Sequence, residues 1–132
     1  MDLLHRLPTV DEHAALAESV GWSDHFDAST RESSLAGSLH GVVVASGDHV
    51  VAMGRVVGDG SHYFYVQDVI VHPAHSDEGL GSRVMAALLE WIRSVADERA
   101  FVGLFASPEA VDLYREFGFE EPSDMTGMHL SL

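Results

Sequence analysis

The segment "VHPAHSDEGLGSRVM", residues 71–85, joins an apolar strand pattern to an apolar helix pattern through a loop with Gly79 and Gly81. The first turn of a helix has unpaired backbone N–H groups and the positive end of the helix dipole, so it attracts anions. Glycine lets the backbone approach an oxygen atom closely. The loop therefore predicts an anion site, although the carboxylates of Asp77 and Glu78 directly precede it.

Two common phosphate-binding loops do not fit this segment. A P-loop ends in Gly-Lys-Ser/Thr, and the chain contains no lysine. A dinucleotide-binding fingerprint needs three spaced glycines and an acidic residue about 20 positions later. Only Gly79 and Gly81 are spaced in this way. A nucleotide-binding α/β domain of another kind would therefore lack the lysine and the acidic partner that it needs.

The elements before the loop follow from local signals. Thr9 and Glu12 form a capping box for a helix expected over residues 9–20, and residues 27–39 predict a second, weaker helix. Residues 39–60 contain two apolar runs separated by a Gly-Asp pair, which predicts two strands joined by a tight turn.

The elements around and after the loop complete the pattern. Residues 61–73 predict a strand rich in aromatic and β-branched side chains, and residues 79–95 have helical apolar spacing. A short buried strand is expected over residues 99–106, a helix over residues 107–119 and a final edge strand over residues 125–132. This order predicts an α/β sandwich of a mixed sheet with flanking helices.

Bulk properties limit the class of protein. The 132 residues predict a single domain, residues 1–132, and the absence of cysteine excludes disulfides and thiolate catalysis. Seven basic and 21 acidic residues give a formal net charge of -14, which repels nucleic acid. A solvated acidic surface is the favoured explanation, and a cationic partner or substrate is the alternative. The chain has no apolar run of about 18 residues and no signal-peptide pattern, so we expect a cytoplasmic protein that does not bind membranes.

Two further segments make the loop more specific. "VHP" closes the strand, "SDEGLG" follows it, and "LYREFGF" occupies residues 113–119. Together they resemble the GNAT N-acetyltransferase superfamily, which has a Gln/Arg-x-x-Gly-x-Gly/Ala loop and a later Tyr-x-x-x-Gly-Phe signature. The resemblance covers roughly residues 39–119. It implies a GNAT fold, in which a mostly antiparallel sheet of about six to seven strands is splayed between its two central strands.

The resemblance implies an acetyl-CoA-dependent N-acetyltransferase that uses no metal and acts on a primary amine by direct attack in a ternary complex. The pantetheine arm would pair with the backbone of Val69, Ile70 and Val71, where a plain core strand is equally compatible, and Val69 or Ile70 is a candidate oxyanion donor. Tyr114 would protonate the departing thiolate, unless it is only a packed aromatic residue. The diphosphate would lie on loop residues, namely Asp77, Glu78, Gly79, Leu80, Gly81 and Ser82.

The loop departs from the family pattern. Ser76 stands where the family prefers Gln or Arg, and two carboxylates follow it. A carboxylate within ~6 Å of a diphosphate would cost about 1 kcal/mol, and molar salt would screen most of that. We therefore expect weakened acetyl-CoA binding that improves with added salt, or little effect if both side chains point into solvent. The same departure keeps open a non-catalytic acyl-CoA-binding or regulatory module.

Asp68 is a candidate catalytic base, because burial inside an apolar strand would raise its pKa. Strand alternation places it on one face with Phe64, Val66 and Ile70, opposite Tyr65, unless a bulge exchanges the faces. A structural carboxylate bonded to loop N–H groups is the alternative. Water would then relay the proton.

Aromatic residues are the candidates for binding the acceptor amine: Trp22, Phe26, Tyr63 and Tyr65. An aromatic, acid-rimmed pocket would suit a cationic small-molecule or peptide amine. Trp22 beside Gly21 is alternatively a core residue at a helix end. The nine histidines show no close metal-ligand spacing, so no metal site is expected. The family resemblance also implies that a homodimer can form through sheet edges or helices.

Overall fold

Alternating apolar residues build one five-stranded sheet in a computed structural model that describes residues 1–22 and 27–132. Strand order follows the sequence, and neighbouring strands are antiparallel except for the parallel pair β4–β5. The sheet therefore confirms the mixed, mostly antiparallel α/β fold, whereas the expectation of about six to seven strands is wrong. The strands are β1 (Asp2–Leu4), β2 (His40–Ser46), β3 (His49–Gly58), β4 (Tyr63–Val71) and β5 (Phe101–Gly103).

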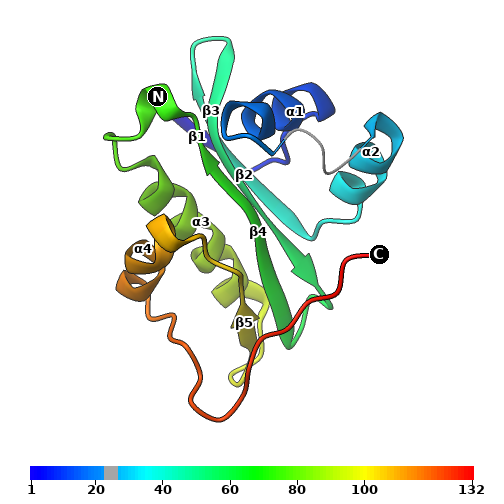
Figure 1. The fold of residues 1–132 in the computed structure, drawn as a ribbon, viewed down its shortest axis with the longest axis vertical. Coiled ribbons are helices and arrows are strands. Elements are labelled where there is room, and N and C mark those ends of the chain that lie inside the picture. The colour runs from blue at the N-terminus through cyan, green and yellow to red at the C-terminus, as the bar shows by residue number, and fades with distance from the viewer. Residues whose placement is uncertain (23–26) are drawn as a thin grey trace.

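Helices cover both faces of the sheet (Figure 1). α1 (Val10–Ser19) and α2 (Ala28–Ala36) lie on one face, where α1 contacts β3 and β4. α3 (Leu80–Val95) packs across β2, β3 and β4 on the opposite face, and α4 (Val111–Glu116) lies on the same side. The sheet is therefore the middle of three layers.

Each face of the sheet has its own hydrophobic core. Strand alternation divides β2 between them, because Val42 and Val44 face α3 while Val43 faces α1. The larger core lies under α3 and includes Val42, Val44, Val56, Phe64, Val84 and Leu88. The smaller core lies under α1 and consists of Leu16, Ala17, Val43, Met53 and Ile70.

Several local signals in the sequence are confirmed. Oγ1 of Thr9 accepts from the Glu12 N–H at 3.1 Å, and Oε1 of Glu12 accepts from the Thr9 N–H at 2.8 Å, which is the expected capping box. Gly21 follows the end of α1 with φ 83, and Gly47 begins the tight turn between β2 and β3 with φ 60. Both φ values lie in the left-handed region that glycine adopts without strain.

β4 contains a β-bulge that sequence periodicity alone does not locate. Gly54 of β3 faces two residues of β4, Asp68 and Val69, whereas the residues around them pair one to one. Asp68 has φ 57, a left-handed conformation that is uncommon for a residue other than glycine. The extra residue shifts the alternation of the strand by one position.

The bulge exchanges the two faces of β4. Before it, Phe64 and Val66 pack in the core under α3; after it, Ile70 packs in the core under α1. Asp68 also lies on the α1 side, where it contacts His13. Plain strand alternation, which would place Asp68 on one face with Phe64 and Val66, therefore does not hold, and the alternative of a bulge that exchanges the faces is confirmed.

β5 pairs with β4 over its whole length, from Phe101 with Tyr63 to Gly103 with Tyr65. β5 ends there, so beyond Tyr65 this edge of β4 has no partner strand among the described residues, where the family resemblance predicts a splay. β5 is the edge of the sheet, however, so the splay does not lie at its centre. Phe101 is 53% exposed, and the expected buried strand is therefore a partly exposed edge strand.

The last part of the chain also differs from expectation. The helix expected from Ser107 begins as a 3-10 turn, Pro108–Ala110, and becomes α-helical only at Val111. Residues 119–132 form no strand, so the predicted final edge strand is wrong. This tail runs past β5 and across the sheet (Figure 1).

Candidate functional site

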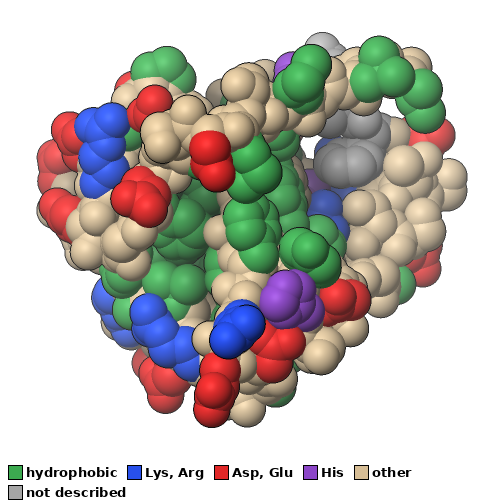
Figure 2. Space-filling view, turned by 90° about the horizontal axis from the view of Figure 1, so that it is seen from below, with side chains coloured by type: hydrophobic (Ala, Val, Ile, Leu, Met, Phe, Trp, Pro, Cys, Tyr) green, Lys and Arg blue, Asp and Glu red, His purple; other side chains and the backbone are tan. Residues whose placement is uncertain are grey.

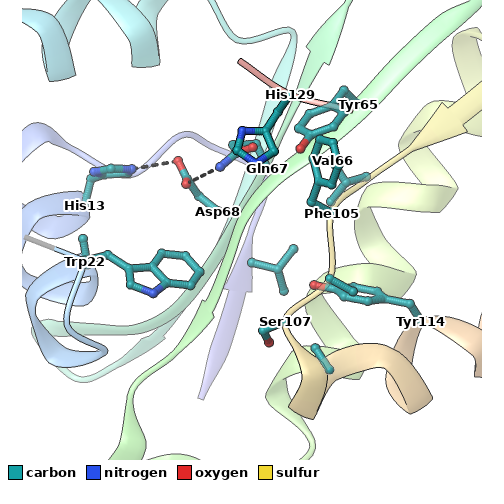
Figure 3. A pocket seen from close by; sticks show the side chains of 14 residues that line it. His13, Trp22, Tyr65, Val66, Gln67, Asp68, Phe105, Ser107, Tyr114 and His129 are labelled. Atoms are coloured by element: carbon teal, nitrogen blue, oxygen red, sulfur yellow. Dashed lines mark hydrogen bonds and ion pairs between the residues drawn. The ribbon is translucent and has the colours of Figure 1, made fainter. Parts of the chain in front are cut away.

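A cavity of about 540 Å³ opens where β4 and β5 separate (Figure 3). Its volume lies within the range of small-molecule sites, about 300–1,000 Å³. Seen from below the molecule, hydrophobic side chains gather along a furrow between the α3–α4 side and the α1–α2 side (Figure 2). The cavity is lined by His13, Ala17, Trp22, Tyr65, Val66, Gln67, Asp68, Val69, Phe105, Ala106, Ser107, Ala110, Tyr114 and His129.

The N-terminal end of α3 is open. Its N-cap, Gly79, has φ 70, and among the described residues no atom beyond Gly79 and its two chain neighbours lies within 4 Å of the position that a Cβ would occupy there. No side chain caps the helix, and the N–H of Arg83 makes the first backbone bond, to the oxygen of Gly79 at 3.2 Å. The N–H groups of residues 79–82 therefore have no backbone acceptor among the described residues. That arrangement fits an anion such as a diphosphate.

The side chains of Asp77 and Glu78 are both exposed. The Glu78 carboxylate is hydrogen-bonded to Nδ1 of His75 within the same loop. One of the two carboxylates is thus held by a neighbouring imidazole. Both side chains therefore lie in solvent, and their charges act on an anion at the helix end only through water.

Tyr114 extends from α4 to the cavity and is only 8% exposed. Its ring packs edge-on against Phe119, with centroids 6.0 Å apart. Burial raises the pKa of Tyr114, and the nearby Tyr65 adds to this effect. The phenol therefore keeps its proton at neutral pH and is available as a donor to a group in the cavity.

Asp68 is buried at the cavity wall and bonded by three side chains. Oδ2 accepts from Nε2 of His13 at 2.9 Å and from Nε of Arg55 at 2.8 Å. Oδ1 accepts from Nε2 of Gln67 at 2.9 Å. Burial alone would raise the pKa of Asp68, but these three hydrogen bonds and the Arg55 charge outweigh it and hold the pKa well below its ordinary value. The expected rise is therefore wrong, and such a carboxylate is a poor base.

The hydrogen bonds of Asp68 continue into α1 and α2. Nε of Arg31 donates to Nδ1 of His13 at 3.1 Å. Because a guanidinium can only donate, Nδ1 is the acceptor, and Nε2 carries the hydrogen that His13 donates to Asp68. Arg55 also donates to the backbone oxygen of Ser34 at 3.1 Å. One buried network thus joins α1, α2, β3 and β4.

The aromatic residues predicted to contact the acceptor do not all meet in the cavity. Trp22 and Tyr65 line it, and Trp22 is 39% exposed instead of packed in a core. Tyr63 does not line it; this residue is 60% exposed and packs against Phe101, where β4 and β5 are still paired. Phe26 lies outside the described residues.

Sequence reasoning missed several cavity residues. His13 shares the apolar face of α1 with Leu16 and Ala17, so a histidine at helical spacing in that face was the available signal. Phe105 and His129 complete the aromatic wall, with ring centroids 6.1 Å apart. Their position depends on the separation of β4 from β5 and on the path of the tail, for which the sequence contains no local signal.

Two further properties of the described residues concern metal ions and membrane spans. No group of three or more His, Asp or Glu side chains in residues 1–22 and 27–132 is arranged to hold a metal ion. No helix in that part of the chain is long and apolar enough to cross a membrane.

Known proteins resemble this chain in both sequence and structure. The profile of the family described as "Acetyltransferase (GNAT) family" matches residues 7–119. The crystal structure of a probable acetyltransferase of unknown function from meticillin-resistant Staphylococcus aureus superposes with a TM-score of 0.91 at 30% identity. That alignment covers 99% of this chain and 98% of the other.

Curated relatives are longer than this chain. A protein of Glycine max named histone acetyltransferase is 28% identical over 127 residues, which is 86% of this chain and 53% of the relative. Serotonin N-acetyltransferase 2, chloroplastic, of Oryza sativa subsp. japonica is 35% identical over 85 residues, 64% of this chain and 42% of the relative. The chain thus spans about half the length of these relatives. Since one of them is named as chloroplastic, a cytoplasmic location stays a prediction.

Proposed function

This chain belongs to the acetyltransferase (GNAT) family, and on that premise we propose that it transfers the acetyl group of acetyl-CoA to a primary amine by direct attack in a ternary complex. The observation that carries the proposal is the cavity between β4 and β5. The bulged backbone of β4 and the ring of Tyr114 both line this cavity, so a thioester there would have a backbone donor and a phenol within reach.

The described residues fit acetyl-CoA. The N–H groups of residues 79–82 are free to hold the diphosphate, and the left-handed Gly79 leaves open space beside them. The pantetheine arm would lie along Val69, Ile70 and Val71, because the edge of β4 that faces β5 has no paired strand beyond Tyr65. The acetyl end would then reach the cavity.

Each step of the proposed reaction can then be assigned to a chemical group. Acetyl-CoA supplies a thioester carbon that the amine attacks, so a C–N bond forms as the C–S bond breaks. We assign the stabilisation of the carbonyl oxygen to the N–H of Val69, which follows Asp68 at the bulge. Tyr114 donates a proton to the departing sulfur. We assign the proton of the amine to water, because both oxygens of Asp68 already accept hydrogen bonds and its pKa is lowered.

Ligand binding and turnover test the proposal separately. Acetyl-CoA and free CoA should raise the melting temperature, ATP should not, and thiol should be released with at least one class of primary amine. Stabilisation by acetyl-CoA with no thiol release on any amine would instead support the non-catalytic acyl-CoA-binding module. No stabilisation by acetyl-CoA at all would refute both.

Tyr114→Phe tests the proton donor. The variant keeps the packed ring but lacks the hydroxyl, so kcat should fall by about a hundredfold or more while the acetyl-CoA dissociation constant stays unchanged. Tyr63→Phe is the matched control, since Tyr63 is exposed and does not line the cavity. Equal turnover by wild type and Tyr114→Phe would remove Tyr114 from the mechanism.

A further inference from the structure

The side-chain amide of Gln67 has a defined orientation at the cavity wall. Its Nε2 lies 2.9 Å from Oδ1 of Asp68. An ionised carboxylate only accepts hydrogen bonds, so the NH2 group must face Asp68 and Oε1 must face away from it. Asp68 is itself held by Arg55 and His13, and the orientation of the amide is therefore set by the buried network.

Oε1 of Gln67 is left as an acceptor for a molecule in the cavity. No donor among the described residues bonds to it, and no buried side-chain oxygen or nitrogen in that part of the chain lacks a partner. Oε1 is therefore accessible, and Gln67 lines the cavity. An amine nitrogen that donates one N–H to this oxygen keeps its lone pair for the thioester carbon.

The walls around Gln67 are aromatic. Trp22 lies on one side of the cavity, and Tyr65 and Phe105 lie on the opposite side (Figure 3). The ring of Phe105 is 58% exposed and can therefore contact a ligand. Flat rings on both sides suit a flat apolar ligand, because aromatic pairs gain energy beyond the area they bury.

The described residues that line the cavity carry little net charge. Asp68 is the one carboxylate among the lining residues that the structure describes, and the Arg55 charge offsets it. These lining residues include no arginine, and the chain has no lysine. The acid rim expected from the sequence is therefore not found in this part of the wall. A second cationic group on the acceptor would meet no carboxylate in this part of the wall other than Asp68.

Building on the proposed function, we infer that the acceptor is a primary amine carried on a flat apolar body. Its nitrogen hydrogen-bonds to Oε1 of Gln67, and its body lies against Trp22 and Phe105. Asp68 acts as a positioning residue, because it orients the amide that holds the nitrogen. The neutral amine attacks, the C–N bond forms as the C–S bond breaks, and Tyr114 protonates the departing sulfur. The proton that the amine loses goes to water, from which Tyr114 is protonated again.

A panel of amines tests the substrate class. 2-Phenylethylamine and tryptamine should have kcat/KM values about tenfold or more above those of putrescine, spermidine and glucosamine 6-phosphate. A preference for the polyamines or the sugar phosphate would overturn the inference and leave acetyl transfer standing. Failure of every amine would instead overturn the proposed function itself, and the inference with it.

Two phenylalanines provide a matched pair for the aromatic wall. Phe105→Ala should raise KM for tryptamine about three- to tenfold and raise KM for 1-propylamine by a smaller factor, because that amine has no ring to pack against the wall. Phe101→Ala is the control, because Phe101 belongs to the same β5 region, is 53% exposed and does not line the cavity. Equal effects of the two substitutions on tryptamine would contradict the proposed wall.

Gln67→Met tests the acceptor oxygen. Methionine has nearly the same length but no amide, so kcat/KM for the amine should fall about tenfold while KM for acetyl-CoA is unchanged. Asp68→Asn should weaken amine binding in the wild-type background and add nothing in the Gln67→Met background, since its effect passes through Gln67. Wild-type kinetics in Gln67→Met would refute the role of Gln67, whether or not Asp68→Asn folds.

Discussion

At the scale of single residues, the surroundings of Asp68 decide its role. Most of the residues around it in β4 are apolar, and an apolar strand on its own predicts a raised pKa and a catalytic base. Two of the three donors that reverse this effect come from distant positions, since His13 is 55 residues away in sequence and Arg55 is 13 residues away, while Gln67 is adjacent. The carboxylate is therefore a structural and orienting group, placed next to the cavity by the bulge.

Asp68→Asn should lower stability by about 3–5 kcal/mol at pH 7, because it leaves the buried Arg55 without its counter-charge. The folded-state pKa of Asp68 is lowered, so its contribution is present above the unfolded-state pKa, about 3.9, and is lost as pH falls toward the folded-state value. Urea unfolding should thus show a constant difference between wild type and variant from pH 5 to 8 that shrinks below about pH 4.

Asp124→Asn is the control for this measurement, since Asp124 is exposed in the tail and should change stability by less than about 0.5 kcal/mol. A difference between wild type and Asp68→Asn that grows as the solution becomes more acidic would contradict the lowered pKa.

At the scale of elements, the loop before α3 combines an open helix end with an unfavourable charge. Gly81 lets α3 approach α4 closely, because a Cβ there would lie 3.2 Å from Cδ2 of Leu113. The same glycine keeps side chains away from the N–H groups. Asp77 and Glu78 add negative charge beside these groups, so the loop should hold a diphosphate less tightly than its backbone geometry allows.

Acetyl-CoA affinity should hold or rise between 20 mM and 1 M NaCl, because salt screens the repulsion from the two carboxylates. The double variant Asp77→Asn, Glu78→Gln should bind more tightly at low salt, by about tenfold, and lose affinity as salt increases. Titration calorimetry measures both. Glu90→Gln, which removes an exposed charge further along α3, should behave as wild type. A wild-type affinity that falls steadily with salt would show that the side chains of Asp77 and Glu78 do not weaken acetyl-CoA binding.

At the scale of the whole molecule, charge repulsion is the main general feature. A net charge of -14 on 132 residues destabilises the compact state through self-repulsion. The same negative field attracts cationic molecules and repels anionic ones in the surrounding solution. The described residues that line the cavity, however, carry little negative charge. Surface charge and acceptor recognition are therefore separate properties of this protein.

The melting temperature at pH 7 should rise by a few degrees between 20 mM and 1 M NaCl, because the Debye length falls to about 3 Å. Calorimetry near the sequence pI of about 4.7 is the control, since the net charge is close to zero there and the salt effect should vanish. A salt response of equal size at both pH values would assign the effect to something other than net charge.

Elements with strong local signals could be predicted from the sequence. The capping box of Thr9 and Glu12, the turn at Gly47 and the helical spacing after Gly79 each depend on neighbours within a few residues. The sequence is a weaker guide to β5 and to residues 119–132. A short apolar run can form a buried strand, an edge strand or no strand, and the elements that pack against it decide which.

The sequence by itself determined the order of helices and strands, the family and the open helix end at Gly79, because each is written in contiguous residues with a local physical meaning. Only the tertiary structure decided which face of β4 Asp68 occupies, which donors lower its pKa and which rings meet at the cavity. These depend on one bulge and on contacts between residues far apart in the chain, and no period in the sequence encodes them.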